Sequence, residues 1–484
     1  MASVAQPVPA QVPALKVAPW PLLAVILLAV AALAIGWVGF VFSDDASYYR
    51  GASEWVAKPP FAGDDHWTTR FPLVLSLAGA ILLLGDGSNA LALTSALWYL
   101  GFVVAGTMLA RRIAGEQAGW IAAALIATMP LIATAGSVVN CDLPEALFLV
   151  GGIVLLADAK TGLRACLAGL CFGAAILCRE TAILGMAALG PLFLAGRPFP
   201  RRILLAAGLG CLGLLAAEML FQWAMTGEPL HRYLLAFHHD TSVNRADNLE
   251  GNLLVNPLVD PILVLLINNE FGLLFPLALY AVWAGAGRGL APDRSRALLL
   301  LGAMAVSAFV AVATLGDKLV LNPRYFTLAA LAATVAVALW LVRIPPRWRL
   351  PIVAAMIGSN LLLLSAQNQH PQWPAEALVL AAQEFPSRRI VTDGATLRRA
   401  ELPLAWEELA NVGRIGEEKG LLLLPDTGPL AGPEPLRRYA SPATPLGALL
   451  IRLNVDDLLP GAARTRLVSP SQPMLLLSPE PPIG

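Results

Sequence analysis

Charged residues are scarce in this sequence. Only 14% of the 484 residues are Asp, Glu, Lys or Arg, whereas 57% are hydrophobic. Soluble globular domains contain about 25% charged residues, so this composition excludes that class and indicates a protein embedded in a lipid bilayer. The 33 basic residues equal the 33 acidic ones, and the sequence has no basic tail. We therefore expect no nucleic-acid partner.

Cysteine is also rare, with five residues. These cysteines lack the spacing of metal ligands, and four of them fall inside apolar runs. We interpret them as small packing residues rather than as a metal or disulfide framework.

Long apolar runs are abundant, by contrast, over the first 365 residues. The run from Trp20 to Phe42 is long enough to cross about 30 Å of hydrocarbon, so it predicts an uncleaved transmembrane helix rather than a signal peptide. With the later apolar segments we expect about eleven spans. The segments at 165–178 and 182–195 are short and predict a hairpin whose tip dips into the membrane. The further segments are 91–110, 118–135, 145–157, 203–223, 262–286, 297–315, 326–342 and 350–364.

Arginine and lysine are concentrated in alternate connections, which the positive-inside rule places in the cytoplasm. This predicts a multi-pass protein of a bacterial inner membrane with a disordered cytoplasmic tail at 1–19. The transmembrane domain, 20–365, would carry the outer loops 43–90 and 224–261. Within the first loop, the short apolar stretch 71–84 is expected to lie at the membrane interface.

The sequence changes character after residue 365. Short apolar runs at 389–392, 421–424 and 474–477 predict strands, and a helical pattern covers 374–385. We expect residues 366–484 to form a small α/β domain in the periplasm; a partly ordered tail is the alternative. The predicted fold class is thus an all-α polytopic membrane domain with a small C-terminal α/β extracytoplasmic domain.

Two adjacent acids, Asp44 and Asp45, directly follow the first predicted helix. The dipole of a helix disfavours acids at its C-terminal end, so capping of that helix does not explain them. One of the two is expected to cap the next helix, and the other is a candidate functional carboxylate.

A second acidic pair lies at the outer mouth of the predicted helices. Asp142 and Glu145 are three residues apart, the spacing that puts two side chains on one helical face. Because Pro144 suits a first helical turn, a capping box is an equally good interpretation. Both interpretations, a functional site and a helix cap, therefore remain open for Asp142 and Glu145.

Arginines accompany these acids on the same face. Arg179 and Glu180 stand at the predicted hairpin tip, where charges usually face a cavity or a partner; mutual neutralisation is the alternative. Arg324 follows an outer loop that contains Lys318, and its guanidinium either extends harmlessly to the interface or binds a phosphate as a fork.

The five histidines all fall in segments assigned to the outer face. His239 and Asp240 in the second outer loop are candidate metal ligands, although neighbouring ligands are not a specific motif. Nothing in the predicted chemistry requires a metal or another cofactor, so a divalent ion remains an alternative.

These motifs occur in an order that resembles the C-type polytopic glycosyltransferases. The similarity covers roughly residues 20–345 and is greatest to the branch of the protein O-mannosyltransferases and the bacterial aminoarabinose lipid A transferases. The motifs that carry it are the Asp44-Asp45 pair, Arg70-Phe71-Pro72-Leu73, Ala110-Arg111-Arg112-Ile113-Ala114-Gly115, Asp142-Leu143-Pro144, Arg179-Glu180 and Arg324-Tyr325-Phe326.

The resemblance implies inverting transfer of a sugar from a polyprenyl-phosphate carrier to a hydroxyl of a lipid, glycan or protein acceptor. Asp44 would be the catalytic carboxylate, and Asp142 matches the second acidic position of the family. Some relatives have lysine and glycine at the hairpin tip, where this chain has Arg179 and Glu180. The residues expected to bind substrate are Asp45, His66, Glu145, Arg179, Glu180, Lys318, Arg324 and Tyr325.

Three other functions remain alternatives. A transporter or flippase of lipid-linked sugars also needs many helices and a few buried charges, but it usually places those charges at the midplane of repeated, broken helices. A ligase that moves whole glycans onto lipid A would use the same fold. A non-catalytic scaffold would leave the Asp44-Asp45 pair unexplained.

Overall fold

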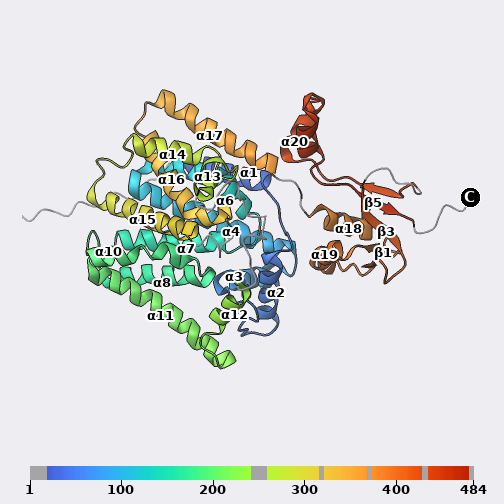
Figure 1. Ribbon diagram of the computed structural model, residues 1–484, viewed down its shortest axis with the longest axis horizontal. Coiled ribbons are helices and arrows are strands. Elements are labelled where there is room, and N and C mark those ends of the chain that lie inside the picture. The colour runs from blue at the N-terminus through green and yellow to red at the C-terminus, as the bar shows by residue number, and fades with distance from the viewer. Residues whose placement is uncertain are drawn as a thin grey trace, which may run out of the picture.

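The protein consists of a bundle of helices joined to a small α/β region (Figure 1). The computed structural model describes residues 19–240, 259–314, 321–367, 370, 372–427 and 434–478. The bundle contains α1 (Pro19–Ile35), α2 (Asp44–Ala57), α3 (Phe71–Leu84), α4 (Ser88–Ala114), α5 (Glu116–Thr128), α6 (Pro130–Ala135), α7 (Asp142–Ala157), α8 (Gly162–Cys178), α9 (Ala182–Met186), α10 (Leu189–Ala195), α11 (Arg201–Thr226), α12 (His231–Asp240), α13 (Asp260–Ile267), α14 (Leu274–Trp283), α15 (Pro292–Thr314), η1 (Pro323–Phe326), α16 (Thr327–Leu341) and α17 (Pro346–Gln367).

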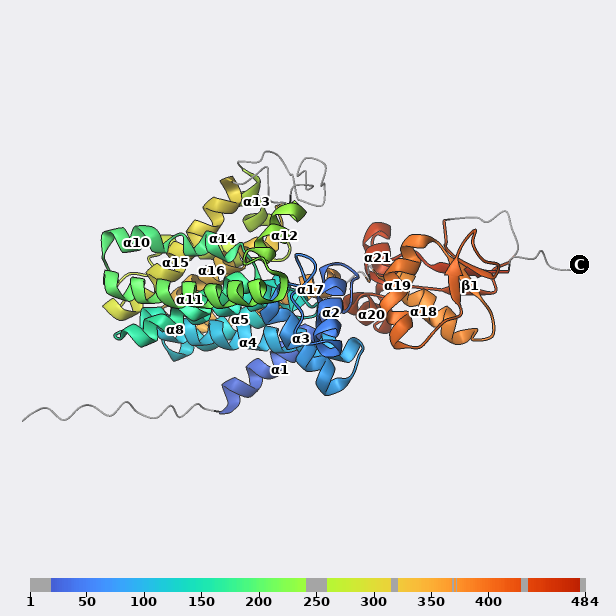
Figure 2. The same cartoon turned by 90° about the horizontal axis from the view of Figure 1, so that it is seen from below.

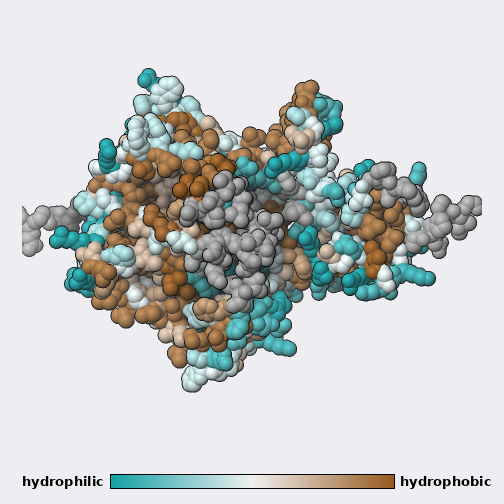
Figure 3. Space-filling view, viewed as in Figure 1, coloured by the Kyte–Doolittle hydropathy of each residue, from teal (hydrophilic) through white to brown (hydrophobic). Residues whose placement is uncertain are grey.

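Five of the described helical segments are long and apolar enough to cross a membrane. They are Ser88–Ala114, Arg201–Thr226, Pro292–Thr314, Pro323–Leu341 and Pro346–Gln367. Shorter apolar helices lie beside them, and the surface of the bundle is broadly apolar (Figure 3). The chain is therefore a multi-pass membrane protein, while the expected total of eleven spans stays a prediction.

Several predicted spans are interrupted in the structure. The segment 118–135 divides into α5 and α6 because Pro130 cannot continue the helix before it, and 262–286 divides at the turn between α13 and α14. The prediction of one helix over Trp20–Phe42 is wrong, since α1 ends at Ile35. Beyond it, Gly39 and Phe42 have φ values of 78° and 51°, which a helix does not allow.

Helices α8 and α11 pack through glycine. A Cβ atom on Gly169 would lie 1.8 Å from the carbonyl oxygen of Ala207, and one on Gly210 would lie 2.1 Å from that of Cys166. Small residues let two backbones approach closely where lipid offers no hydrophobic drive for association. The contact holds the N-terminal half of α8, and Arg179 and Glu180 follow the C-terminal end of that helix.

The C-terminal region lies beyond one end of the bundle, on the side of α2 and α17 (Figure 2). Its mixed five-stranded sheet has the order β2-β1-β3-β5-β4, with β1 parallel to β2 and β3 and with β5 antiparallel to β3 and β4. Strands β1, β3 and β5 lie where the apolar runs predicted them. The strands are β1 (Ile390–Thr392), β2 (Val412–Arg414), β3 (Leu421–Pro425), β4 (Arg437–Tyr439) and β5 (Met474–Leu477).

Helices of this region accompany the sheet, and α18 matches the pattern predicted at 374–385. They are α18 (Trp373–Glu384), α19 (Gly394–Trp406), α20 (Pro445–Arg452), η2 (Asp456–Leu458) and α21 (Gly461–Val468). Buried Leu378, Ile390, Leu423 and Leu476 belong to one core between helix and sheet. The C-terminal part of the chain thus has its own hydrophobic core.

We predict that Gly169→Ala destabilises the bundle, because the new methyl group meets backbone that cannot move aside. Overpacking of this kind costs about 1–3 kcal/mol. Thermal unfolding in detergent, followed through exposure of the buried cysteines to a thiol-reactive dye, measures the effect. Gly208→Ala on α11 is the matched control, because its Cβ has open space around it. Equal melting temperatures for the two variants would contradict the packing described here.

Candidate active site

The turn between α1 and α2 is organised by Asp45. Its carboxylate accepts hydrogen bonds from the backbone N–H groups of Val41 at 2.7 Å, Ser43 at 2.6 Å and Ala46 at 3.1 Å. Asp45 is 1% exposed, and burial raises the pKa of its carboxyl although the three N–H groups oppose that shift. Asp45 therefore holds the backbone of the turn, and its contact with substrate stays a prediction.

Asp44 is the first residue of α2, and its side chain is one-third exposed. Neither acid is the N-cap, which is Ser43 without a side-chain hydrogen bond. The Asp44 carboxylate lies 3.8 Å from a guanidinium nitrogen of Arg324, which enters from η1. The turn thus presents one acid to the surface and uses the other internally.

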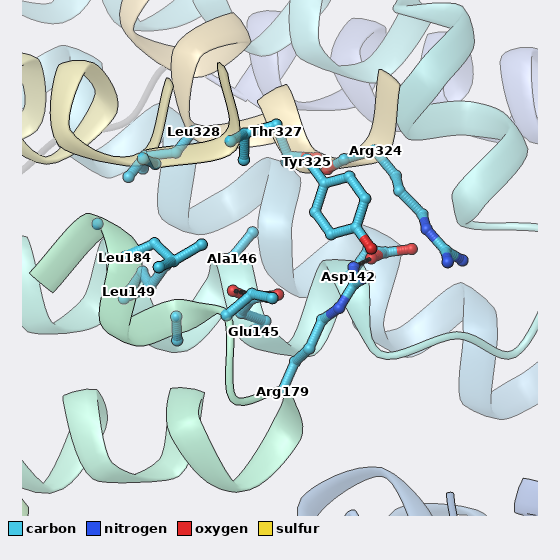
Figure 4. Close-up of a pocket in the computed structure, with 15 residues that line it drawn as sticks. Asp142, Glu145, Ala146, Leu149, Arg179, Leu184, Arg324, Tyr325, Thr327 and Leu328 are labelled. Atoms are coloured by element: carbon cyan, nitrogen blue, oxygen red, sulfur yellow. Dashed lines mark hydrogen bonds and ion pairs between the residues drawn. The ribbon is translucent and has the colours of Figure 1, made fainter. Parts of the chain in front are cut away.

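Asp142 and Arg179 form a second, buried ion pair. Asp142 begins α7, whose N-cap Cys141 makes no side-chain cap bond, so the capping-box alternative is wrong. The ring of Tyr325 covers the pair, with its centroid 4.4 Å from the Arg179 guanidinium carbon and 5.7 Å from that of Arg324. The two arginines therefore share one aromatic ring between them (Figure 4).

These side chains line one pocket of about 480 Å³, part of it open to solvent. One end is polar and contains Asp142, Arg179 and Arg324; Glu145 lies deeper and accepts a hydrogen bond from the Thr181 hydroxyl at 3.4 Å. The other end is apolar (Figure 4) and is lined by Ala146, Leu149, Leu184, Val312 and Leu328. A ligand with an anionic head and an apolar tail matches both ends.

The alternative that Arg179 and Glu180 neutralise each other is wrong. Glu180 instead accepts hydrogen bonds from Arg232 of α12 at 2.6 and 3.1 Å. Arg232 is 0% exposed and also donates to the carbonyls of Thr69, Leu177 and Ile176 at 2.9–3.0 Å. Glu180 is thereby part of a structural cluster and is not among the residues that line the pocket.

Arg70, from the motif Arg70-Phe71-Pro72-Leu73, is a second buried arginine, and the sequence analysis assigned it no role. Its guanidinium donates to the Tyr48 hydroxyl and to Cys141 Sγ at 3.2 Å, and it lies 2.5 Å from His66 Nε2. His66 therefore contacts Arg70 rather than the pocket. Nothing in the local sequence separates these buried arginines from solvated ones; only the tertiary packing does.

Glu270, between α13 and α14, is a further acid that the sequence analysis missed. The backbone carbonyl of Glu270 accepts a hydrogen bond from the Leu131 N–H at 3.1 Å, which ties the turn to α6. The Glu270 side chain is not among those that line the pocket.

The C-terminal region contacts the Asp45 turn directly. Gln372 donates a hydrogen bond to the carbonyl of Val41 at 2.7 Å, and Trp406 of α19 donates to the Tyr49 hydroxyl at 2.9 Å. The Trp406 ring also packs edge-on against Phe40 and Tyr49. The C-terminal region therefore contacts the chain both before Asp44, at Phe40 and Val41, and after it, at Tyr49.

Three expected site residues receive no structural account. Lys318 lies outside the described residues, and so do the side chains of His239 and Asp240, although their backbone ends α12. Within the described ranges no group of three His, Cys, Asp or Glu side chains is placed to hold a metal ion. The described cysteines are all free.

We predict that Arg232→Met strongly destabilises the protein, because the partly buried Glu180 carboxylate and three carbonyls lose their donor. Breaking a buried ion pair costs about 3–5 kcal/mol. Arg50→Met is the matched control: Arg50 is about half-exposed and pairs with Asp64 and Asp65 at the surface, where ion pairs contribute about 0–1 kcal/mol. Thermal unfolding in detergent measures the effect. Equal melting temperatures for the two variants would contradict the structural role of Arg232.

The chain has matches in sequence and in structure. Residues 71–223 match the family described as dolichyl-phosphate-mannose-protein mannosyltransferase. No curated protein sequence gives a significant match. The matched segment begins at α3 and extends into α11, so it includes Asp142 and Arg179.

Solved structures share the fold over most of the chain. The apo crystal structure of ArnT from Cupriavidus metallidurans has a TM-score of 0.60 and 15% identity, covering 84% of this chain and 92% of that chain. The structure of the same protein bound to undecaprenyl phosphate has a TM-score of 0.58 and 14% identity, covering 84% of this chain and 93% of that chain. The structure of the Archaeoglobus fulgidus oligosaccharyltransferase in complex with Zn and sulfate has a TM-score of 0.53 and 17% identity, covering 81% of this chain and 62% of that chain. These matches confirm the resemblance to the C-type polytopic glycosyltransferases.

Proposed function

We propose that this protein is an inverting glycosyltransferase that takes a sugar from a polyprenyl-phosphate carrier and transfers it to a hydroxyl of a lipid, glycan or protein acceptor. The observation that carries this proposal is the pocket beside Asp44. Asp44 is one-third exposed and lies 3.8 Å from Arg324, and the pocket next to it is lined by two arginines and an apolar wall. The fold shared with ArnT bound to undecaprenyl phosphate supports a lipid-linked donor.

The arginines suit the phosphate of such a donor. The planar guanidinium binds phosphate oxygens in a fork, which an ammonium group does not reproduce. Arg324 is only loosely paired with Asp44 at 3.8 Å and is partly exposed, so it is available to an incoming anion. Arg179 is already committed to Asp142, and it adds positive potential from beneath the Tyr325 ring.

The apolar end of the pocket suits the polyprenyl chain. Leu149, Leu184 and Leu328 line it, and they come from α7, α9 and α16. A donor seated in this way would place its phosphate at Arg324 and its sugar at the outer mouth, near Asp44.

In the proposed reaction, Asp44 accepts the proton of the acceptor hydroxyl. The hydroxyl oxygen forms a bond to the anomeric carbon on the face opposite the phosphate. The bond from that carbon to the phosphate oxygen breaks, and its electron pair leaves with the phosphate, where Arg324 stabilises the added charge. Attack opposite the leaving group inverts the configuration of the sugar.

The location proposed for this chemistry is the periplasmic face of a bacterial inner membrane. The N-terminus would then be cytoplasmic and the C-terminal region periplasmic, as the distribution of arginine and lysine favours. A divalent ion would assist the departing phosphate if one were bound.

We predict that Asp44→Asn abolishes sugar transfer while leaving the fold and the donor affinity intact. Removal of a general base lowers the rate about 10²–10⁴-fold, and the amide is nearly isosteric with the carboxylate. Transfer of labelled sugar from a panel of polyprenyl-phosphate sugars to membrane extracts measures the effect. Asp64→Asn, an exposed acid of the same outer loop, is the control and should keep wild-type activity.

Two outcomes would contradict different parts of this proposal. Full activity of Asp44→Asn would remove Asp44 as the base while leaving the enzyme class in place. If the folded wild type consumed no donor of the panel, the glycosyltransferase proposal would fail and a transporter of lipid-linked sugars would take precedence.

A further inference from the structure

A helical hairpin in the C-terminal region carries an apolar face that the protein itself leaves uncovered. The hairpin, residues 445–468, consists of α20, η2 and α21. Three of its leucines are largely exposed: Leu449 at 51%, Leu453 at 60% and Leu458 at 81%. Isolated exposed leucines are common, but several on one small hairpin indicate an interaction surface.

The hairpin is built as a rigid unit. Thr444 caps α20 by accepting a hydrogen bond from the Gly447 N–H at 3.0 Å. A Cβ atom on Gly447 would lie 2.0 Å from the carbonyl oxygen of Leu467, so α20 and α21 are in close backbone contact. The leucines are therefore presented by an ordered element.

The charged residues of the hairpin include an ion-paired group and one exposed arginine. Arg464 of α21 pairs with Asp456 at 3.1 Å and with Asp457 at 2.7 Å, so these groups satisfy one another. Arg452 ends α20 and is exposed beside Leu453. An apolar face bordered by arginine is typical of helices that lie at a membrane interface, where the cation meets lipid phosphate.

The position of the hairpin identifies the lipid surface it meets. Helix α20 packs against α17, which is long and apolar enough to cross the membrane. The contact is at the C-terminal end of α17, where the chain leaves the bundle (Figure 1). Near that end Leu362 of α17 is 53% exposed on the surface of the span. The leucines of the hairpin therefore continue the lipid-facing surface of α17 beyond the bundle, and Figure 3 shows apolar side chains at that place.

We propose that the hairpin 445–468 is a membrane-interface anchor that inserts Leu449, Leu453 and Leu458 into the leaflet reached by the C-terminal end of α17. The partner is the phospholipid surface of the same membrane, with Arg452 at its phosphate groups. The anchor holds the C-terminal region against the membrane independently of its contacts to the Asp45 turn. This inference does not depend on the proposed enzymatic activity.

The test uses the full chain in phospholipid nanodiscs, with the five native cysteines replaced by alanine and one polarity-sensitive fluorophore attached through L458C. The label should show blue-shifted emission, strong quenching by nitroxide-labelled lipids and weak quenching by aqueous iodide. L362C on α17 is the lipid-exposed reference. I415C, an exposed apolar position beside the edge strand β2, is the water-exposed reference.

Two results would overturn the anchor. Strong iodide quenching at position 458, equal to that at 415, would show that the leucines face water. Protection from both iodide and lipid quenchers would show that a protein surface, such as a second copy of the chain, covers them. Because position 458 is 81% exposed, the label itself does not disturb packing.

Discussion

The carboxylate of Asp45 holds the short turn on which the candidate site depends. Three backbone N–H groups converge on it, and Phe42, inside that turn, has the left-handed φ of 51°. A bulky side chain rarely adopts this conformation unless its surroundings impose it. The turn ends the first helix early and starts α2 with Asp44 pointing outward. A mobile turn would leave the distance between Asp44 and Arg324 undefined.

The pocket is assembled from elements far apart in the sequence. Asp142 comes from α7, Arg179 from the end of α8, and Arg324 and Tyr325 from η1, while Asp44 of α2 lies beside the pocket, next to Arg324. The Arg232 cluster fixes the end of α8, and the glycine contact with α11 holds the first half of that helix. Gln372 and Trp406 fix the turn before α2 from the C-terminal region. Charged groups are thus pre-positioned by packing, which lets them stabilise developing charge without reorganising.

The sequence was most informative where a single helix or strand decides the outcome. Apolar runs located the helices and three strands, and the acids and arginines of the pocket stood out as charges at the ends of apolar segments. The pairing of those charges was not predictable. Arg179 and Glu180 are neighbours in the chain, yet the end of α8 directs one to Asp142 and the other to Arg232. Asp44 and Asp45 look equivalent in the sequence, and only the path of the backbone before them assigns one to structure and one to the surface. Arg232 looked like any basic residue of a long loop.

The most direct test of the account is a cryo-EM structure of the protein with a polyprenyl phosphate bound. The account predicts phosphate density within hydrogen-bond distance of the Arg324 guanidinium, the first isoprene units along Leu149 and Leu328, and the Asp44 carboxylate open to the mouth of the pocket. Phosphate density at the opposite end of the bundle, or away from Arg324 with the pocket filled by side chains, would contradict it.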